Sequence, residues 1–210
     1  MLDIATQKSF QERFSTIRTL KKEHLVPEQE KVQLSIKDAG RHSFFEYLGN
    51  TYFVKDLHTY EETSDDYKSK KGYFIYELTC LCFETGQAVN LEWEFDDVLE
   101  ASMTLERLSF RHLKDDEGAP IDEDDLDQIA DDKDVIVING EKFWYTDDWA
   151  SVYYRGDREE KVYMYEFENE NQTKSLTIEE WSGSGREEYQ IYTSSPVDPN
   201  SISVISKGDL

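Results

Sequence analysis

Long runs of aromatic and β-branched residues, separated by short polar turns, constrain the fold of this chain most. The clearest run is GYFIYELTCLCFETGQAVNLEWEF at residues 72–95, where two strands flank a turn at Thr85-Gly86-Gln87. Such runs between turn-forming residues are typical of β-strands. Apolar side chains occupy both alternating faces of the first strand, so we expect it to be covered on both sides. The chain is therefore predicted to be mostly β, within the α+β class.

The two halves of the chain repeat this pattern. Three segments of the first half match three of the second: LGNTYF with NGEKFW, TCLCFE with YMYEFE, and NLEWE with SLTIE. The offset between the halves changes at a polar loop and at a hairpin turn, where insertions are tolerated best. We predict two pseudo-repeated antiparallel modules, each a β-sheet or small barrel, at residues 41–114 and 135–210.

Residues 1–40 are predicted to hold an amphipathic helix and a connection. Ser9 and Glu12 fit the S-x-x-E capping box, so the helix is expected to begin at Ser9. Lys21, Lys22 and His24 are expected in its last turn, and Pro27 marks its exit. Its apolar stripe consists of Phe10, Phe14 and Ile17. We expect the stripe to pack on the helix's own domain, and a helix that seeks a partner or a membrane is the alternative.

Residues 115–134 form an acidic connector between the two modules. Pro120 followed by Asp122–Asp125 is typical of a helix start, because carboxylates favour the first turn. Ile121, Leu126 and Ile129 are predicted to dock this short helix on a sheet. The acidic patch comprises Asp122, Glu123, Asp124, Asp125, Asp127, Asp131 and Asp132. An EF-hand calcium loop is absent, and no metal site is predicted.

The net charge of −23 is unevenly distributed along the chain. Residues 1–60 contain 9 Lys and Arg against 8 Asp and Glu, whereas residues 61–210 contain 14 against 38. Such a field repels nucleic acids and anionic lipids and attracts basic proteins. We expect no direct binding to nucleic acid and a protein partner with a basic surface. Adaptation to high salt is another explanation, against which the 15 lysines and the many aromatic residues argue.

The sequence predicts a cytoplasmic protein. No run approaches about 18 apolar residues, so no membrane span is expected, and MLDIATQKSF lacks the layout of a secretory signal. Cys80 and Cys82 lie two residues apart on one predicted strand and share a face. Because no second pair accompanies them, we interpret them as small buried residues kept reduced rather than as half of a metal or redox site.

No enzyme signature accompanies these strands, and no cofactor is predicted. Glu94 and Glu179 occupy matching positions in the two halves and are the carboxylates most suited to a functional role. Cross-strand pairing with a basic side chain is their structural alternative. Interfaces are enriched in aromatic residues, so the candidate interface residues are Trp93, Trp144, Trp149 and Trp181, unless they fill the core.

The second half resembles the bacterial family named domain of unknown function 4178. The resemblance rests on NGEKFWY, VYMYEFE, LTIEEW and the final YTSSPVDPNSISVI, and a looser copy follows LGNTYFVKD, YELTCLCFE and NLEWEF. It implies a small β-rich fold that often occurs in tandem, a bacterial or phage origin and an accessory role. The family offers no catalytic residues to transfer.

Three function classes remain open at this point. The first is a non-enzymatic accessory or adaptor protein that binds a partner through an acidic, aromatic-rich β surface. The second is an acidic inhibitor of a basic target, as a nucleic-acid mimic or a toxin-neutralising protein would be. The third is a small-ligand binder or an enzyme with a pocket between the repeats. The sequence does not determine the oligomeric state.

Overall fold

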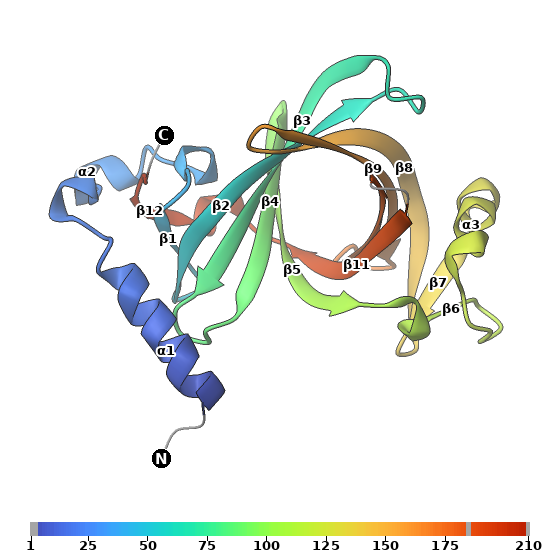
Figure 1. The fold of residues 1–210 in the computed structure, drawn as a ribbon, viewed down its shortest axis with the longest axis horizontal. Helices are drawn as coiled ribbons and strands as arrows, with labels where there is room; N and C mark the ends of the chain where they lie inside the picture. Colours follow the sequence, from blue (N-terminus) through green and yellow to red (C-terminus); the bar gives the residue numbers. More distant parts are fainter. Residues whose placement is uncertain (1–3, 184–185, 209–210) are drawn as a thin grey trace. The chain divides into compact units, whose positions relative to one another are not determined.

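A computed structural model of the protein describes residues 4–183 and 186–208, and most of these lie in antiparallel strands (Figure 1). The strands are β1 Phe44–Tyr47, β2 Asn50–Thr63, β3 Lys70–Cys82, β4 Ala88–Asp96, β5 Val98–Leu108, β6 Leu113–Lys114, β7 Val135–Ile138, β8 Glu141–Arg155, β9 Arg158–Asn169, β10 Ser175–Gly183, β11 Arg186–Pro196 and β12 Ser203–Ser206. The mostly-β prediction is therefore confirmed.

The helices are short, apart from the first. The α-helices are α1 Ile4–Ile17, α2 Glu28–Lys31 and α3 Leu126–Asp132, and the 3-10 helices are η1 Lys22–His24, η2 Ile36–Asp38, η3 Phe110–His112, η4 Glu123–Asp125 and η5 Pro199–Ser201. Within residues 4–183 and 186–208, no helix has the length and apolar character needed to span a membrane.

The chain divides into two compact units that interleave along the sequence. Unit 1 contains Met1–His58, Tyr76–Ala101 and Val197–Leu210, and unit 2 contains Thr59–Ile75 and Ser102–Pro196. Strands β2, β3 and β5 each contribute residues to both units. The units are therefore not successive stretches of chain, and the tandem repeat stays a prediction.

Unit 1 is built on the hairpin of β1 and β2, with β12 paired to the free edge of β1. Its described apolar cluster joins Phe44, Phe53 and Leu81, and Leu20, Phe83 and Ile205 pack against it. On β3, Leu78 and Leu81 point to opposite faces and are both buried. This confirms the prediction that the strand is covered on both sides.

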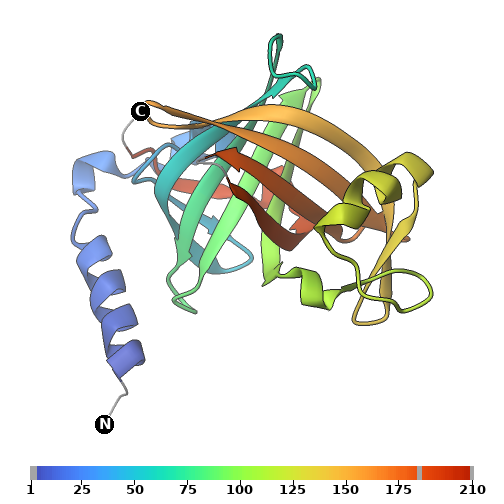
Figure 2. The same cartoon turned by 45° about the vertical axis from the view of Figure 1, so that its right-hand side comes forward.

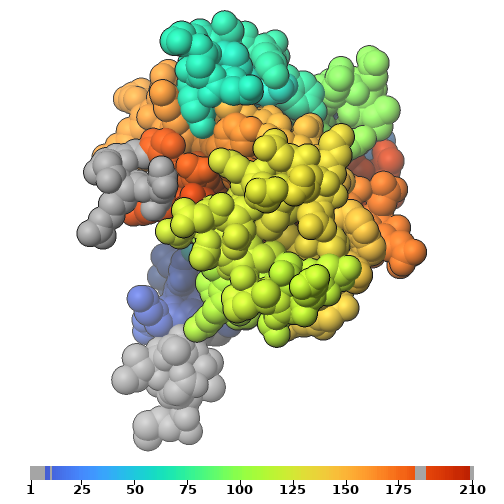
Figure 3. All heavy atoms as spheres, turned by 90° about the vertical axis from the view of Figure 1, so that its right-hand side faces the viewer, coloured from blue at the N-terminus to red at the C-terminus, as the bar shows by residue number. Residues whose placement is uncertain are grey.

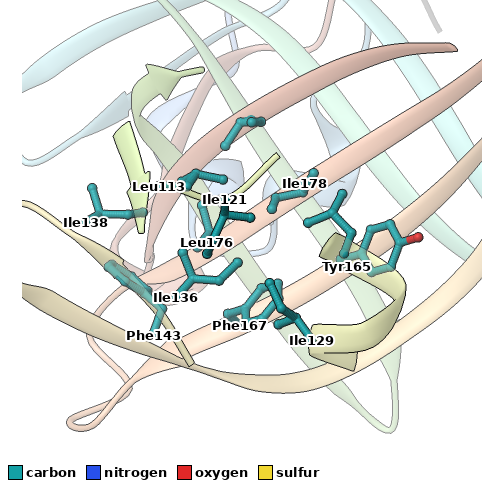
Figure 4. Close-up of a cluster of buried hydrophobic side chains, with 12 residues drawn as sticks. Leu113, Ile121, Ile129, Ile136, Ile138, Phe143, Tyr165, Phe167, Leu176 and Ile178 are labelled. Atoms are coloured by element: carbon teal, nitrogen blue, oxygen red, sulfur yellow. The ribbon is translucent and has the colours of Figure 1, made fainter. Parts of the chain in front are cut away.

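Unit 2 is a ladder in which β8, β9, β10, β11 and the end of β5 pair in that order. β7 pairs with the start of β8, and the end of β2 pairs with the end of β8. Figure 2 shows α3 beside the β7–β8 hairpin. The larger core of this unit is formed by side chains that point toward one another in Figure 4, among them Phe143, Phe167, Leu176 and Ile178.

Two hairpins turn in the same way at positions that the sequence comparison matched. Leu48 and Gly49 connect β1 to β2, and Asn139 and Gly140 connect β7 to β8. Both residues of each turn have positive φ, 47° and 77° in the first and 51° and 84° in the second. Two-residue loops of this kind match the twist of the flanking strands. Sequence and backbone geometry agree on this correspondence between the halves.

The N-terminal helix differs from its prediction at both ends. α1 begins at Ile4, so Ser9 lies inside the helix rather than at its N-cap, because the residues before Ser9 also adopt helical backbone. The helix ends at Ile17, and Leu20 packs on the apolar cluster of unit 1. Lys22 and His24 belong to η1 rather than to the last turn of α1.

Phe14 and Ile17 are 49% and 51% exposed, so the packing of the apolar stripe on its own domain is not confirmed and stays a prediction. The side chain of Phe10 lies outside the described part of the structure.

Candidate functional site

The acidic connector of residues 115–134 is a folded element fixed to unit 2. Ile121, Leu126 and Ile129 are buried in the larger core of this unit, as the sequence predicted (Figure 4). Asp122 is the N-cap of η4, because its side chain accepts a hydrogen bond from the backbone N–H of Asp124. Lys133 ends α3 in the left-handed conformation, with φ of 53°.

All seven residues of the predicted acidic patch are exposed on this element. In Figure 3 the connector, coloured yellow-green to yellow, forms much of the surface that faces the viewer. Residues 115–134 contain eleven Asp and Glu and one basic residue, Lys133. Lys142 of β8 forms an ion pair with Asp116 at the edge of the connector. The result is a concentrated negative surface held on a rigid core.

Two hydrogen bonds orient the outer side chains of α3. The Tyr165 hydroxyl donates to Oδ1 of Asp127 at 2.7 Å, and the Gln128 amide donates to Oδ2 of Asp132 at 2.6 Å. Burial, followed by the bond to Asp127, raises the pKa of Tyr165 above the ordinary range of a phenol. The phenol therefore remains a donor to Asp127 at neutral pH.

A second tyrosine–carboxylate contact lies on β8 and β9. Tyr145 and Tyr163 both donate their hydroxyls to the carboxylate of Asp148. Burial, and then the hydrogen bond to Asp148, raise the pKa of both phenols above their usual value. This group was not predicted from the sequence, although Tyr163 and Tyr165 lie at alternate positions of one strand and therefore share a face.

Glu179 is placed inside unit 2 rather than at its surface. Its side chain is buried, with 2% exposure, and it accepts hydrogen bonds from aromatic side chains. Tyr60 and Tyr192 donate to Oε1 at 2.8 and 2.9 Å, and the indole of Trp181 donates to Oε2 at 2.8 Å. A buried carboxylate needs such donors to replace water. The arrangement links β2, β10 and β11 through polar contacts.

Glu94 has a different environment from Glu179. It lies half-buried on β4 in unit 1, whereas Glu179 belongs to β10 in unit 2. Matching sequence positions therefore do not give matching surroundings. Trp181 lies on β10 with Glu179, and Tyr192 lies on the neighbouring strand β11. Tyr60 is 119 residues away on β2, and no local pattern marks it as a partner.

The four candidate tryptophans divide between core and surface. Trp149 and Trp181 pack against the buried cluster of Tyr60, Tyr153, Val162 and Met164 in unit 2. Trp144 is 42% exposed on β8, next to Tyr145, whose backbone N–H bonds to the carbonyl of Asp134 at the end of the connector. Among these three, Trp144 has the exposure expected of an interface residue.

Trp93 lies in unit 1 and is 9% exposed. Its ring stacks on Tyr76 with 4.1 Å between centroids and an interplanar angle of 9°. The indole N–H is buried and has no hydrogen-bond partner among the described atoms. Trp93 is therefore mainly a core residue, as the alternative interpretation held.

The remaining chemistry-bearing groups are buried or dispersed. Cys80 and Cys82 are buried and form no disulfide, and burial raises the pKa of the Cys80 thiol, which lowers its reactivity. Within the described ranges, no group of three or more His, Cys, Asp and Glu side chains is placed to hold a metal ion. The surface of the connector is therefore the strongest candidate for a binding site.

A family model matches most of the chain. The family model described as Domain of unknown function (DUF4178) matches residues 41–199. The chain belongs to this family. The DUF4178 match confirms the resemblance drawn from NGEKFWY and LTIEEW, and α1 lies before the matched residues. Searches of curated proteins and of solved structures gave no match.

Proposed function

We propose that this member of the DUF4178 family is a non-enzymatic accessory protein that binds a basic protein partner through the acidic connector. The observation that carries the proposal is the docking of Ile121, Leu126 and Ile129 in the core of unit 2 beneath seven exposed carboxylates. A charged segment that is already ordered loses less conformational entropy on binding than a mobile acidic tail.

The negative charge of unit 2 favours a partner with a positively charged surface. Unit 2 contains 29 Asp and Glu against 13 Lys and Arg, whereas unit 1 contains 17 against 10. Complementary charge accelerates association and favours partners of opposite sign. A basic protein therefore meets an attractive field at the connector.

The test is affinity capture with three purified forms of the full chain. The connector variant Glu123→Gln/Asp124→Asn/Asp131→Asn removes three exposed charges and leaves Asp122, Asp127 and Asp132, which hold or contact the element, unchanged. The control variant Glu106→Gln/Asp157→Asn/Glu159→Gln makes the same charge change at exposed positions elsewhere in unit 2. Capture is run from a bacterial lysate at about 0.1 M and 0.5 M salt, because exposed charges are screened within about 10 Å at the lower value.

We expect the wild type and the control to retain one basic protein at the lower salt that the connector variant loses. Recombinant partner then gives the affinity of each form. Equal capture by all three forms, or the loss of the partner with the control variant as well, would refute the connector as the binding surface.

The acidic-inhibitor alternative makes a different prediction about the same partner. If the connector occupies the nucleic-acid site of the partner, duplex DNA or RNA added to the complex displaces this protein. Nucleic acid that binds the partner more tightly displaces more of it. If the partner binds through another surface, nucleic acid leaves the complex intact. Competition therefore separates the adaptor from the inhibitor.

A further inference from the structure

The β2–β3 hairpin ends in a segment, residues 59–75, that belongs to unit 2. The neighbouring parts of both strands belong to unit 1, so this segment is where β2 enters unit 2 and β3 leaves it. Thr59–Glu62 of the segment pair with β8, and this ladder is much shorter than the one from Phe143 to Arg155 that joins β8 to β9. We name the segment the arm, and it is attached by a short ladder and by side chains.

One side of the arm covers Glu179. Tyr60 is 2% exposed, and its hydroxyl donates to Oε1 of Glu179 at 2.8 Å. The ring of Tyr60 packs on that of Tyr153 with 4.6 Å between centroids, and Ile75 packs against the same buried cluster. The donors to Glu179 from β10 and β11 do not belong to the arm. Movement of the arm away from β8 therefore uncovers a carboxylate that these two donors still hold.

The other side of the arm is fastened to β8 by a charged contact. Glu61 follows Tyr60 and points to the opposite face of β2, where it is 8% exposed. Its Oε2 accepts a hydrogen bond from the Tyr154 hydroxyl at 2.5 Å and forms an ion pair with Nζ of Lys70 at 3.2 Å. The Lys70 ammonium also donates to the Tyr154 hydroxyl and lies 5.0 Å from the centroid of its ring. We name Glu61, Tyr154 and Lys70 the latch.

The latch is charged at neutral pH and is open to water on one side. The hydrogen bond with Tyr154, and then the bond with Glu61, raise the pKa of Lys70 above its ordinary value of 10.5, so the ammonium stays protonated. The Lys70 side chain is nevertheless 50% exposed. Exposed ion pairs contribute little to stability, whereas a buried carboxylate that loses a partner is strongly disfavoured. The closed arm therefore depends on a contact for which water competes.

The backbone of the arm has positive φ at two residues. Tyr67 near the tip has φ of 58°, which is unfavourable for a bulky aromatic residue, and Gly72 has φ of 75° within β3. Nζ of Lys161 on β9 lies 4.7 Å from the centroid of the Tyr67 ring and so holds the tip. Strain of this kind persists only where surrounding contacts maintain it, and it is common in segments that switch. Loss of these contacts therefore favours opening of the arm.

We propose that the arm is a lid over Glu179 that opens as one unit, and that Lys70 is the residue that keeps it closed. When the lid opens, the ladder between the arm and β8 separates, the Tyr60 hydroxyl leaves Glu179, and solvent reaches the carboxylate. Folded proteins open locally in such cooperative segments, at a lower free energy than global unfolding requires. The lid contains no residue of the acidic connector, so this proposal goes beyond the proposed function and does not depend on it.

Native-state hydrogen exchange of the full chain, measured amide by amide by NMR over a series of low urea concentrations, tests the lid. In the wild type, the amides that donate across the ladder between residues 59–62 and 151–154 should share one opening equilibrium that depends weakly on urea. Amides of the β9–β10 ladder should depend strongly on urea, because global unfolding exposes more surface. The same strong dependence in both ladders would mean that the arm does not open by itself, and it overturns the proposal.

Two variants weaken the latch and a third is the matched control. Lys70→Met keeps the aliphatic stem and removes the ammonium, and Tyr154→Phe keeps the ring and removes the donor to Glu61. Lys68→Met removes an exposed ammonium that pairs with Asp66 within the arm. We expect both latch variants to exchange the amides of the arm ladder about fivefold faster than the wild type, and the control to stay within about twofold. Unchanged exchange in Lys70→Met refutes the role of Lys70.

Carboxyl labelling tests whether the open lid exposes Glu179. A water-soluble carbodiimide with glycinamide converts accessible carboxylates to amides, which mass spectrometry locates, and urea-unfolded protein gives the reference for full labelling. Lys70→Met should raise the labelling rate of Glu179 about fivefold and leave that of exposed Glu159 unchanged, whereas Lys68→Met should change neither. Faster exchange in the arm without faster labelling of Glu179 would show that the arm is not its cover, and it overturns the proposal.

Discussion

At the scale of single residues, many of the polar contacts in the described part of unit 2 are hydrogen bonds from tyrosine hydroxyls to carboxylates. The hydroxyls of Tyr60 and Tyr192 donate hydrogen bonds to Glu179. Tyr145 and Tyr163 donate to Asp148 in the same way, and Tyr165 donates to Asp127. Each phenol packs its ring with the apolar side chains and places its hydroxyl on an acceptor. These contacts explain how an aromatic-rich and strongly acidic chain builds cores without leaving carboxylates unsatisfied.

Replacing Glu179 by Gln should destabilise the protein by about 2 kcal/mol. The amide keeps one acceptor oxygen, so either the tyrosine hydroxyls or the Trp181 indole would face an NH₂ donor instead. Urea unfolding measures the change. The double variant Glu179→Gln/Trp181→Phe removes the opposing N–H and should cost less than the sum of its single variants. A single variant within about 0.5 kcal/mol of the wild type, like the exposed control Glu188→Gln, would contradict this role.

The tyrosines bonded to Asp148 should titrate at high pH. Burial and then Asp148 raise the folded-state pKa of Tyr145 and Tyr163 above the ordinary 10.0, so the stability they contribute is complete below about pH 10 and is lost as the pH rises further. Asp148→Asn should lower both values and increase phenolate absorbance at 295 nm near pH 11. Asp147→Asn, which changes only a weaker charge near Tyr145, is the control. Identical titration curves for Asp148→Asn and wild type would contradict the assignment.

At the scale of elements, the two hairpin turns carry the clearest local information. Asn139-Gly140 is the sequence that a two-residue turn with positive φ favours, and Leu48-Gly49 adopts positive φ at the same positions with an unfavourable first residue. Asparagine tolerates the left-handed region far better than leucine does. The chain therefore contains a favourable and an unfavourable version of one turn.

Exchanging the first residues of these turns should change stability in opposite directions. Leu48→Asn should stabilise the protein by roughly 0.5–1 kcal/mol, because Leu48 is 77% exposed and contributes little packing. Asn139→Leu should destabilise it by a similar amount. Thermal and urea unfolding of both variants measure the difference. A destabilising Leu48→Asn would show that the Leu48 side chain has a packing role that its exposure does not indicate.

At the scale of the whole molecule, excess negative charge opposes folding in both units, and unit 2 carries the larger share with 29 acidic against 13 basic residues. Ion pairs such as Lys174–Glu141 and Lys71–Glu62 offset only part of it, since exposed pairs contribute little. The same charge that favours a basic partner therefore lowers the stability of the free protein.

Raising the salt concentration should stabilise the free protein. The Debye length falls from about 30 Å at 0.01 M to about 3 Å at 1 M, which screens the repulsion between carboxylates. We expect the urea midpoint at constant pH to rise over this range. The connector variant Glu123→Gln/Asp124→Asn/Asp131→Asn lacks three of these charges and should gain less. An equal gain in both forms would indicate a general salt effect rather than screening at the connector.

The sequence by itself determined the β-rich class, most strand positions, the docking of the connector and the family, because these depend on local alternation, turn residues and short apolar spacings. Membership of the DUF4178 family followed from the same strand patterns. The interleaved units, the Tyr60 donor to Glu179 and the exposure of Phe14 and Ile17 were decided by the tertiary structure alone. They depend on which distant strands pair and which side of a helix finds a surface, and pairing between remote residues leaves no periodic signal in a single chain.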